Sequence, residues 1–396
     1  MAFDEEMDYP AMQVPEQINS TGTQIKQLDP VPEAIRKIAE GKMVIVVDDD
    51  EREDEGDLVV AASRVNAEQV AFMIRHTSGI LCVPMPAERA RALRLDPMVV
   101  HNDAPLSTAF TVSTDYKPGL TTGISAKERA ATVRALADAK VSASDFVRPG
   151  HIFPLIAKEG GVLVRSGHTE AAMDLARLAG LPAVGLIGEL VNDDGTVKRK
   201  PGLLAFAKSH GLTIISINDL IAHRQQREQL VQRVGEFRVA TQIGSARALA
   251  YSTPFDAVQH LALVFGDVND AGPVVVRIHR EQIVADVFGA CDDRQPSSIS
   301  VALRHIQKAG RGVLIYLREG SAGVESPPLA DQGRDAENPG VSAERNRLEQ
   351  WRQVGVGAQI LRDLGVSSIR LLATRQIHYV GLAGFGITID GTEMIR

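Results

Sequence analysis

The chain has 396 residues, 44% of them hydrophobic and 23% charged, and a net charge of −7. This length exceeds one compact core and predicts two domains, and the composition excludes a fibrous or mostly disordered chain. Its two cysteines, Cys82 and Cys291, exclude a disulfide framework and a cysteine-rich structural zinc module, and they suit a reducing compartment. No apolar stretch approaches the roughly 20 residues that cross a bilayer, and the N-terminus is acidic where a targeting peptide is basic. We therefore expect a cytoplasmic protein with no membrane partner.

The negative charge is concentrated in one decapeptide. Residues 48–57, DDDEREDEGD, contain eight carboxylates and one arginine and carry the whole excess of −7. The rest of the chain is balanced and has no basic surplus to neutralise nucleic-acid phosphates. We expect no nucleic-acid partner.

The order of the predicted elements indicates an α/β layered domain over residues 28–228, after a flexible polar arm at 1–27. Strand patterns alternate with amphipathic helix patterns, and Asn66 and Ser125 have the positions of helix caps, the latter with Glu128 in a capping box. We predict helices at 30–40, 67–76, 125–138, 168–180, 201–210 and from 218, and strands at 43–47, 57–63, 78–83, 151–157, 161–165, 183–190 and 213–217.

Residues 229–396 show a similar alternation and predict a second α/β unit. The polar stretch 319–347 has little periodicity and predicts a long loop. In this unit we predict strands at 237–244, 261–268, 274–279, 312–317 and 369–374, and helices at 297–309 and 352–364.

The acidic decapeptide is a candidate metal site. Like charges this close repel one another, and desolvating any of them costs free energy unless a cation is present. Mg²⁺ binds through a few protein carboxylates and keeps positions open for water and substrate oxygens. The competing interpretation is a solvated acidic loop, favoured for an arbitrary charge run at about three to one. The run directly follows the buried strand 43–47 and closes with Gly56 and Asp57 before another strand, which favours the metal site.

The segment RSGHTEA at 165–171 is a candidate anion site. Backbone N–H groups at a helix start, the Arg165 guanidinium and the Thr169 hydroxyl suit a phosphate. His168 can bind a metal or transfer a proton. The alternative, given equal weight, is that Thr169 only caps the helix and that His168 is an exposed neighbour.

Weaker candidates are Arg148 and His151 in RPGHIFP and the hydroxyls of LTTGIS at 120–125. Cys82 is expected to be a buried strand residue and not a nucleophile, because a lone cysteine usually packs as a small hydrophobe. A carboxylate metal loop combined with phosphate-binding helix starts indicates an enzyme that acts on a small phosphorylated polyol or sugar. An enediolate intermediate stabilised by a divalent ion suits this set of groups.

Six segments share their residues and their order with a known family: 49–57, 74–82, 120–125, 147–155, 160–180 and 188–196. Through them, residues 30–225 resemble the 3,4-dihydroxy-2-butanone 4-phosphate synthase family. The resemblance implies a lyase of riboflavin biosynthesis that converts ribulose 5-phosphate to 3,4-dihydroxy-2-butanone 4-phosphate and formate, with Mg²⁺ or Mn²⁺. It also implies a layered α/β domain on a mixed sheet and a homodimer whose pocket draws on both subunits.

The same resemblance implies roles for individual residues. Glu53 and His168 are expected to hold the metal. The loop at 100–107 departs from the family pattern, with Val100 to Asp103 in place of Glu-Asn-Asn and Ser107 in place of a glycine. Roles in substrate binding, proton transfer or the pocket wall are implied for Arg52, Glu55, Asp57, Cys82, Thr122, His151, Arg165, Thr169 and Glu189.

The remainder is similar to GTP cyclohydrolase II but lacks the family's catalytic groups. Gln282, Asp293 and Gln295 stand where that family has three zinc cysteines, and Cys291 is out of register. Amides and one carboxylate do not form a tetrahedral thiolate site. The family's Glu-Gly-Arg-Gly-Ile-Gly and guanine-pocket runs are also altered, at 319–324 and 374–378. We predict that this domain binds no zinc, lacks cyclohydrolase activity and serves as a structural, dimerising or regulatory module.

Two alternatives stay open. The protein could be a bifunctional enzyme that also opens GTP with other metal ligands, or a non-catalytic nucleotide-binding scaffold. The retained acidic loop and histidine motif argue against the scaffold, because a scaffold has no use for a costly cluster of like charges.

Overall fold

The computed structural model describes residues 28–48, 53–104, 106, 108–254, 256–270, 272–282, 286–287, 297–318, 355–374 and 386–395. The predicted arm at 1–27 and the predicted loop at 319–347 lie outside these residues. Among the described residues, no helix is both long and apolar enough to cross a membrane.

The first unit is built on a mixed sheet with the strand order β4-β5-β3-β6-β2-β1-β7. Strand β1 runs parallel to β7 and antiparallel to β2, and β3 runs parallel to β5 and antiparallel to β6. The predicted mixed-sheet α/β fold is therefore confirmed. The strands are β1 (Val44–Val47), β2 (Gly56–Ala61), β3 (Cys82–Pro86), β4 (Thr114–Tyr116), β5 (Phe146–Ala157), β6 (Gly185–Glu189) and β7 (Thr213–Ser216).

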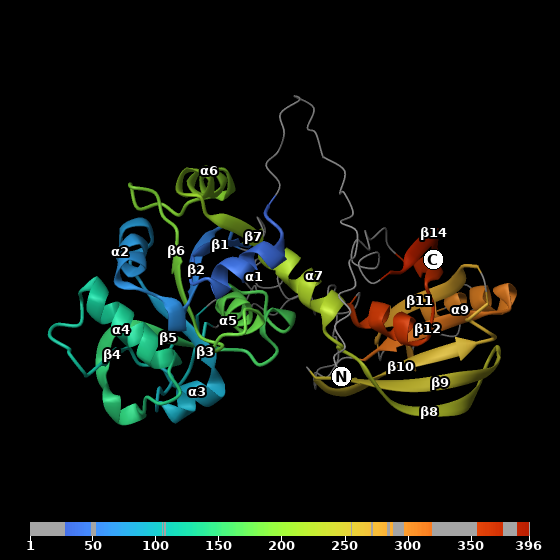
Figure 1. Cartoon of the computed structure of the whole chain (residues 1–396). Helices are drawn as coiled ribbons and strands as arrows, with labels where there is room; N and C mark the ends of the chain where they lie inside the picture. Colours follow the sequence, from blue (N-terminus) through green and yellow to red (C-terminus); the bar gives the residue numbers. More distant parts are fainter. Residues whose placement is uncertain are drawn as a thin grey trace, which may run out of the picture.

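Helices cover both faces of this sheet (Figure 1). Helices α2, α4 and α6 contribute Met73, Val133 and Leu203 to one apolar cluster, and α1, α5 and α7 contribute other residues to a second. Since both faces are covered, β1 and β2 are continuous runs of buried residues. The helices are α1 (Val31–Ala39), α2 (Ala67–His76), α3 (Ala87–Ala92), α4 (Ala126–Ala137), α5 (His168–Leu178), α6 (Lys200–His210) and α7 (Ile217–Arg227), with short 3₁₀ turns at Ala62–Arg64, Ala143–Asp145 and Gly161–Leu163.

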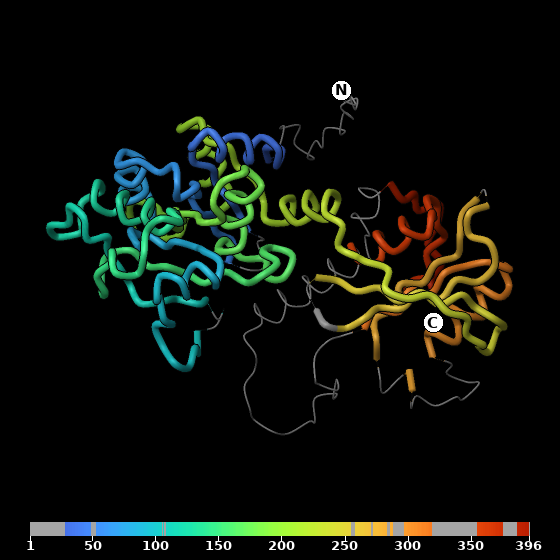
Figure 2. The backbone as a smooth tube through the Cα atoms, turned by 60° about the horizontal axis from the view of Figure 1, so that its bottom comes forward, coloured from blue at the N-terminus to red at the C-terminus, as the bar shows by residue number. Residues whose placement is uncertain are grey.

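Helix α7 leads from the first unit into the second, which has its own mixed sheet with the order β14-β13-β11-β12-β10-β9-β8 (Figures 1 and 2). Helix α9 (Ser298–Ala309) packs into one apolar cluster, and the helical residues 355–363 pack into another. The strands are β8 (Gln232–Thr241), β9 (Gly244–Thr253), β10 (Asp256–Phe265), β11 (Val274–Arg280), β12 (Gly312–Leu317), β13 (Ser368–Ala373) and β14 (Thr388–Met394).

One predicted strand is wrong. Residues 161–165 begin with a 3₁₀ turn, because Gly160 and Gly161 have φ angles of +93° and +64° and interrupt the extended chain. A side chain at Gly161 would lie 2.2 Å from the Asp174 carboxylate, so the turn is tightly packed. Helix α3 and the strands β4, β9 and β14 were not predicted from the sequence.

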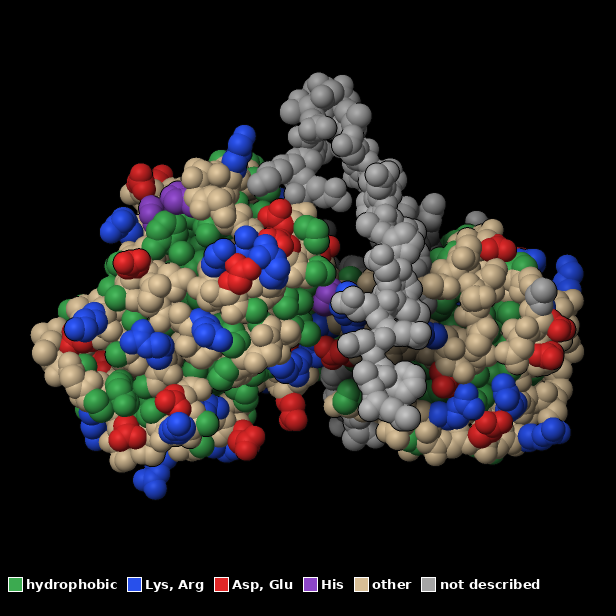
Figure 3. Space-filling model, viewed as in Figure 1, with side chains coloured by type: hydrophobic (Ala, Val, Ile, Leu, Met, Phe, Trp, Pro, Cys, Tyr) green, Lys and Arg blue, Asp and Glu red, His purple; other side chains and the backbone are tan. Residues whose placement is uncertain are grey.

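Aromatic rings join α2 to α6. The ring centroids of His76 and His210 lie 5.4 Å apart, and Phe72 and Phe206 complete the group. Figure 3 shows histidine side chains gathered on this part of the surface. These contacts fix the position of α6 on the first unit, directly beside the acidic loop.

Candidate active site

The candidate residues gather at one edge of the first sheet. Strand β1 ends at Val47, opposite Gly56 at the start of β2, and Asp57 pairs in register with Glu189 at the end of β6. Cys82, at the start of β3, pairs with Ile187 of β6. Because these neighbouring strands are antiparallel, the end of one lies beside the start of the next. The acidic loop, Glu189 and Cys82 therefore share this edge.

Asp48 organises the acidic loop from within. Its carboxylate accepts hydrogen bonds from the backbone N–H groups of Glu53 (3.2 Å) and Glu55 (3.0 Å). Its own N–H donates to the carbonyl of Glu55 at 3.2 Å. Asp48 thus fixes residues 53–55, the limb of the acidic loop that returns to β2. Arg52, a predicted substrate contact, lies outside the described residues.

Helix α5 brings His168 to the loop. His168 is the first residue of α5 and is only 6% exposed. Ligand atoms of Asp48, Glu53 and His168 all lie within 4.8 Å of one another, and so do those of Glu55, Asp57 and His168. The structure thus brings the acidic loop and His168 together, as the sequence predicts.

The donor set fits a hard divalent cation, since it combines carboxylate oxygens with one imidazole. Asp57 is buried, and its Oδ1 has no hydrogen-bond partner among the described residues. Burial raises the pKa of Asp57 well above its usual value, and the negative charges of Glu189, Glu55, Glu53 and Asp48 raise it further. A cation at this position would offset both effects.

The alternative interpretation of RSGHTEA, with Thr169 as a cap and His168 exposed, is wrong. Gly167 is the N-cap of α5, and both Thr169 and His168 are buried. Arg165 lies beside this helix start, where its Nη1 donates to Glu170 Oε2 at 2.8 Å. Burial raises the pKa of Glu170, although Arg165 acts in the opposite direction.

Two other candidates border the sheet edge. Glu189 accepts a 2.6 Å hydrogen bond from the hydroxyl of Ser78, which the sequence analysis did not select. Cys82 is 3% exposed, and burial raises the pKa of its thiol, with Glu189 and Asp57 adding to the shift. A thiol held in its neutral form is a poor nucleophile, which agrees with the predicted pocket wall.

His151 belongs to a separate group. Its Nδ1 lies 2.7 Å from Asp115 Oδ2, and its backbone N–H donates to Asp115 Oδ1 at 2.9 Å. A side chain at Gly123 would lie 2.2 Å from Asp115 Oδ2, so the loop with the exposed Thr122 packs against this pair. Strand β5 is the third strand from β2, which places the two backbones roughly 14 Å apart. Asp115 carries no sequence signal beyond its carboxylate.

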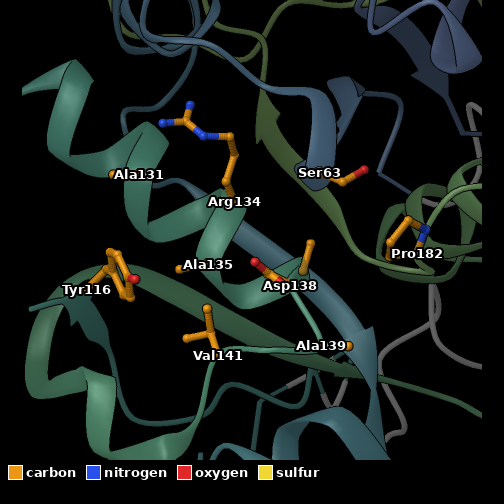
Figure 4. A pocket seen from close by; sticks show the side chains of 10 residues that line it. Ser63, Tyr116, Ala131, Arg134, Ala135, Asp138, Ala139, Val141 and Pro182 are labelled. Carbon is orange, nitrogen blue, oxygen red and sulfur yellow. The ribbon is translucent and has the colours of Figure 1, made fainter. Parts of the chain in front are cut away.

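A pocket of about 590 Å³ opens elsewhere on the first unit (Figure 4). Figure 4 shows Arg134 and Ala131 on α4, with Ser63 and Pro182 across from them. None of the candidate site residues that the structure describes lines this pocket. It is distinct from the sheet edge that carries the acidic loop.

In the second unit, Gln282 is the one position expected to replace a zinc ligand that lies within the described residues. Gln282 donates its backbone N–H to Asp286 Oδ2 at 2.8 Å, and Asp286 also contacts the buried His279 and the hydroxyl of Tyr316. Burial lowers the pKa of His279, although Asp286 acts against this. The other positions, at Cys291, Asp293, Gln295, 319–324 and 375–378, lie outside the described residues.

Comparison with known proteins separates the chain into the same two parts. Residues 32–223 match the family model of 3,4-dihydroxy-2-butanone 4-phosphate synthase, and residues 232–395 match that of GTP cyclohydrolase II. The riboflavin biosynthesis protein RibBA of Nocardia farcinica is 46% identical over 373 residues, which cover 92% of this chain and 89% of that protein. The chain belongs to the RibBA family of riboflavin biosynthesis proteins. It is an enzyme with a synthase domain and a cyclohydrolase II-like domain.

Two further relatives carry names that state different activities. A probable bifunctional riboflavin biosynthesis protein of rice, Oryza sativa subsp. japonica, is 45% identical over 375 residues, which cover 91% of this chain and 66% of the rice protein. The crystal structure of RibBX from A. baumannii, described as a two-domain 3,4-dihydroxy-2-butanone 4-phosphate synthase, is 38% identical. It covers 93% of this chain and all of its own, with a TM-score of 0.76.

Proposed function

We propose that the first unit converts ribulose 5-phosphate to 3,4-dihydroxy-2-butanone 4-phosphate and formate, with Mg²⁺ or Mn²⁺ as its metal. The observation that supports this most directly is the cluster of acidic-loop carboxylates around the buried His168. In this proposal Glu53 and His168 hold the metal, and Asp48 keeps the loop in position. The metal, when bound, stabilises negative charge that develops on the substrate oxygens.

The remaining residues bind substrate or move protons. Asp57 lies in this cluster, and its buried Oδ1 has no hydrogen-bond partner among the described residues, which suits a group that takes up and returns protons during enolisation. Glu189, held by Ser78, is a second candidate acid or base. Cys82 forms a wall of the pocket. Further substrate contacts or proton transfers are proposed for Arg52, Glu55, Thr122, His151, Arg165 and Thr169.

We propose a homodimer as the working form. His151 and Thr122 lie on the same sheet edge as the metal cluster but several strands away, so a second copy is a means of bringing equivalent residues to the cluster. Apolar side chains are exposed in loops of the first unit, including Val100, which is 94% exposed. An exposed apolar set of this kind favours a protein interface. Its other members are Ile80, Met98, Val99 and Ile124.

For the second unit, residues 229–396, we propose that zinc and cyclohydrolase activity are absent. Gln282 occupies the first expected ligand position, and an amide is not a zinc ligand of the thiolate type. The name of the two-domain relative from A. baumannii states synthase activity alone. The rice relative is named bifunctional, which favours the alternative that this chain also opens GTP.

One set of assays tests both parts of the proposal. The full chain is incubated with ribulose 5-phosphate and Mg²⁺, then with EDTA, and formate is measured; we expect release that stops when the metal is removed. The same chain is incubated with GTP and Zn²⁺, and we expect no formate. Absence of formate from ribulose 5-phosphate would contradict the proposed synthase, whereas zinc-dependent formate from GTP would establish the bifunctional alternative.

A further inference from the structure

The limb of the acidic loop that returns to β2, residues 53–55, needs support from outside the loop. It carries Glu53 and Glu55, and its N–H groups are bound by Asp48. Its middle residue, Asp54, has a φ of +50°, a left-handed conformation that residues with a side chain adopt less readily than glycine. Contacts on the carbonyl side of the limb are therefore required to hold its shape.

Arg199 provides those contacts. Its Nη1 donates hydrogen bonds to the carbonyl oxygen of Glu53 and, at 3.0 Å, to that of Asp54. Its Nε lies 4.0 Å from Asp54 Oδ2. Asp48 thus binds the N–H groups of the limb, and Arg199 binds its carbonyl groups. Arg199 also places a positive charge beside the most acidic part of the chain.

Arg199 is itself held by the sheet edge. The chain turns back after Glu189, where the N–H of Lys198 donates to the carbonyl of Leu190 at 2.9 Å, and Arg199 follows as the N-cap of α6. Leu203, in the first turns of α6, packs under Gly56, where an added Cβ would lie 2.8 Å from it. Arg199 therefore connects the Glu53 limb to the same edge that carries Glu189.

We propose that Arg199 is a positioning residue for the metal site: by binding the carbonyl groups of Glu53 and Asp54, it keeps the Glu53 carboxylate directed at His168. This inference rests on the proposed function, which assigns Glu53 and His168 as ligands. Groups that support a metal ligand without touching the metal typically contribute 10- to 100-fold to affinity. Arg199 acts on metal affinity and not on binding of the sugar phosphate.

The test is Mn²⁺ binding to the full chain without substrate, followed by electron paramagnetic resonance. We expect Arg199→Ala to weaken Mn²⁺ binding by about 10- to 100-fold, and Arg199→Lys to recover part of the loss, because an ammonium group can still donate to one carbonyl. Arg91→Ala is the matched control, since Arg91 is exposed on α3, and we expect its affinity to equal that of the wild type.

Steady-state kinetics separates positioning from direct substrate binding. With saturating Mg²⁺, we expect Arg199→Ala to keep the wild-type KM for ribulose 5-phosphate and to regain most of its kcat. Wild-type Mn²⁺ affinity in Arg199→Ala, with or without a raised KM, would overturn the inference. The same titration of Glu53→Ala tells the two failures apart: if that variant also binds Mn²⁺ normally, the ligand assignment of the proposed function is the part that fails.

Discussion

The ligand atoms of Glu53 and His168 lie within 4.8 Å of each other, although most of the first sheet lies between them in the sequence. Neither residue belongs to an apolar cluster. We therefore expect Glu53→Ala and His168→Ala to lower formate release from ribulose 5-phosphate by more than about 100-fold while the far-ultraviolet circular dichroism spectrum stays unchanged. Glu88→Ala, on α3, is the control. Wild-type rates in either ligand variant would remove that residue from the metal site.

Two glycines with the same backbone conformation make a matched pair for testing the His151 group. Gly123 and Gly119 have φ angles of +81° and +74°, so alanine costs each roughly 1–2 kcal/mol. A Cβ at Gly123 would also lie 2.2 Å from Asp115 Oδ2 and 2.7 Å from His151 Nδ1, whereas a Cβ at Gly119 would have no atom of the described residues within 4 Å.

We therefore expect Gly123→Ala to displace His151 and lower kcat by about 100-fold. Gly119→Ala should lower the melting temperature less than Gly123→Ala, because it carries only the backbone cost, and should leave kcat near the wild-type value. Both quantities can be measured on the same preparations of the full chain. Equal kcat values for the two variants would show that the pairing of Asp115 with His151 is not required for turnover.

Glu128 holds the loop that contains Thr122 and predicts a specific pH dependence. The Ser125 hydroxyl, followed by the N–H and hydroxyl of Thr121, lowers the pKa of Glu128 from 4.5 to about 2. Since the charged form is favoured in the folded state, its stabilising effect is complete above pH 4.5 and is lost as the pH falls toward 2.

We expect Glu128→Gln to unfold at lower urea concentration than the wild type at neutral pH. The difference between the two midpoints should narrow as the pH falls below about 4.5. Urea titrations at several pH values measure it. A difference that stays the same from neutral to acidic pH would mean that the charge of Glu128 does not hold this loop.

The sequence predicted those features that depend on neighbouring residues. The Asn66 cap of α2 is present with Gln69 as a full capping box. Ser125 caps α4, although the Glu128 carboxylate binds the Thr121 N–H in addition to the Ser125 hydroxyl. The buried runs of β1 and β2 were found because both of their faces are covered. Strand β9 was missed because small residues weaken its alternation of apolar and polar positions. The strand predicted at 161–165 was wrong because the glycine pair at its start forms a 3₁₀ turn.

The site was predicted in part for the same reason. Motifs and family resemblance selected the acidic loop and His168, which the structure brings together. Arg199, Asp115 and Ser78 were not selected, because each acquires its position only through contacts with residues far away in the sequence. No local pattern distinguishes such residues from ordinary surface polar groups.

A buried ion pair secures α5, which carries His168 at its start. Arg224 of α7 is 2% exposed and donates to Asp174 Oδ2 at 2.6 Å and to the carbonyl of Gly160 at 2.7 Å. Burial raises the pKa of Asp174, and Arg224 is the largest influence in the opposite direction. Arg177 contacts the same carboxylate at 2.9 Å, but its side chain is 46% exposed.

Removal of Arg224 would leave the Asp174 charge buried, so we expect Arg224→Ala to lower the free energy of unfolding by about 3–5 kcal/mol. Arg177→Ala, the matched control, should cost less than about 1 kcal/mol, since the Arg177 side chain is 46% exposed and Arg224 still pairs with the Asp174 carboxylate. In the double variant Arg224→Ala/Asp174→Ala, part of the loss should be recovered because no unpaired buried charge remains. Calorimetry of the full chain measures all of these effects. If Arg224→Ala is no more destabilising than Arg177→Ala, the buried pair does not secure α5, and the position of His168 depends on the other contacts of this helix.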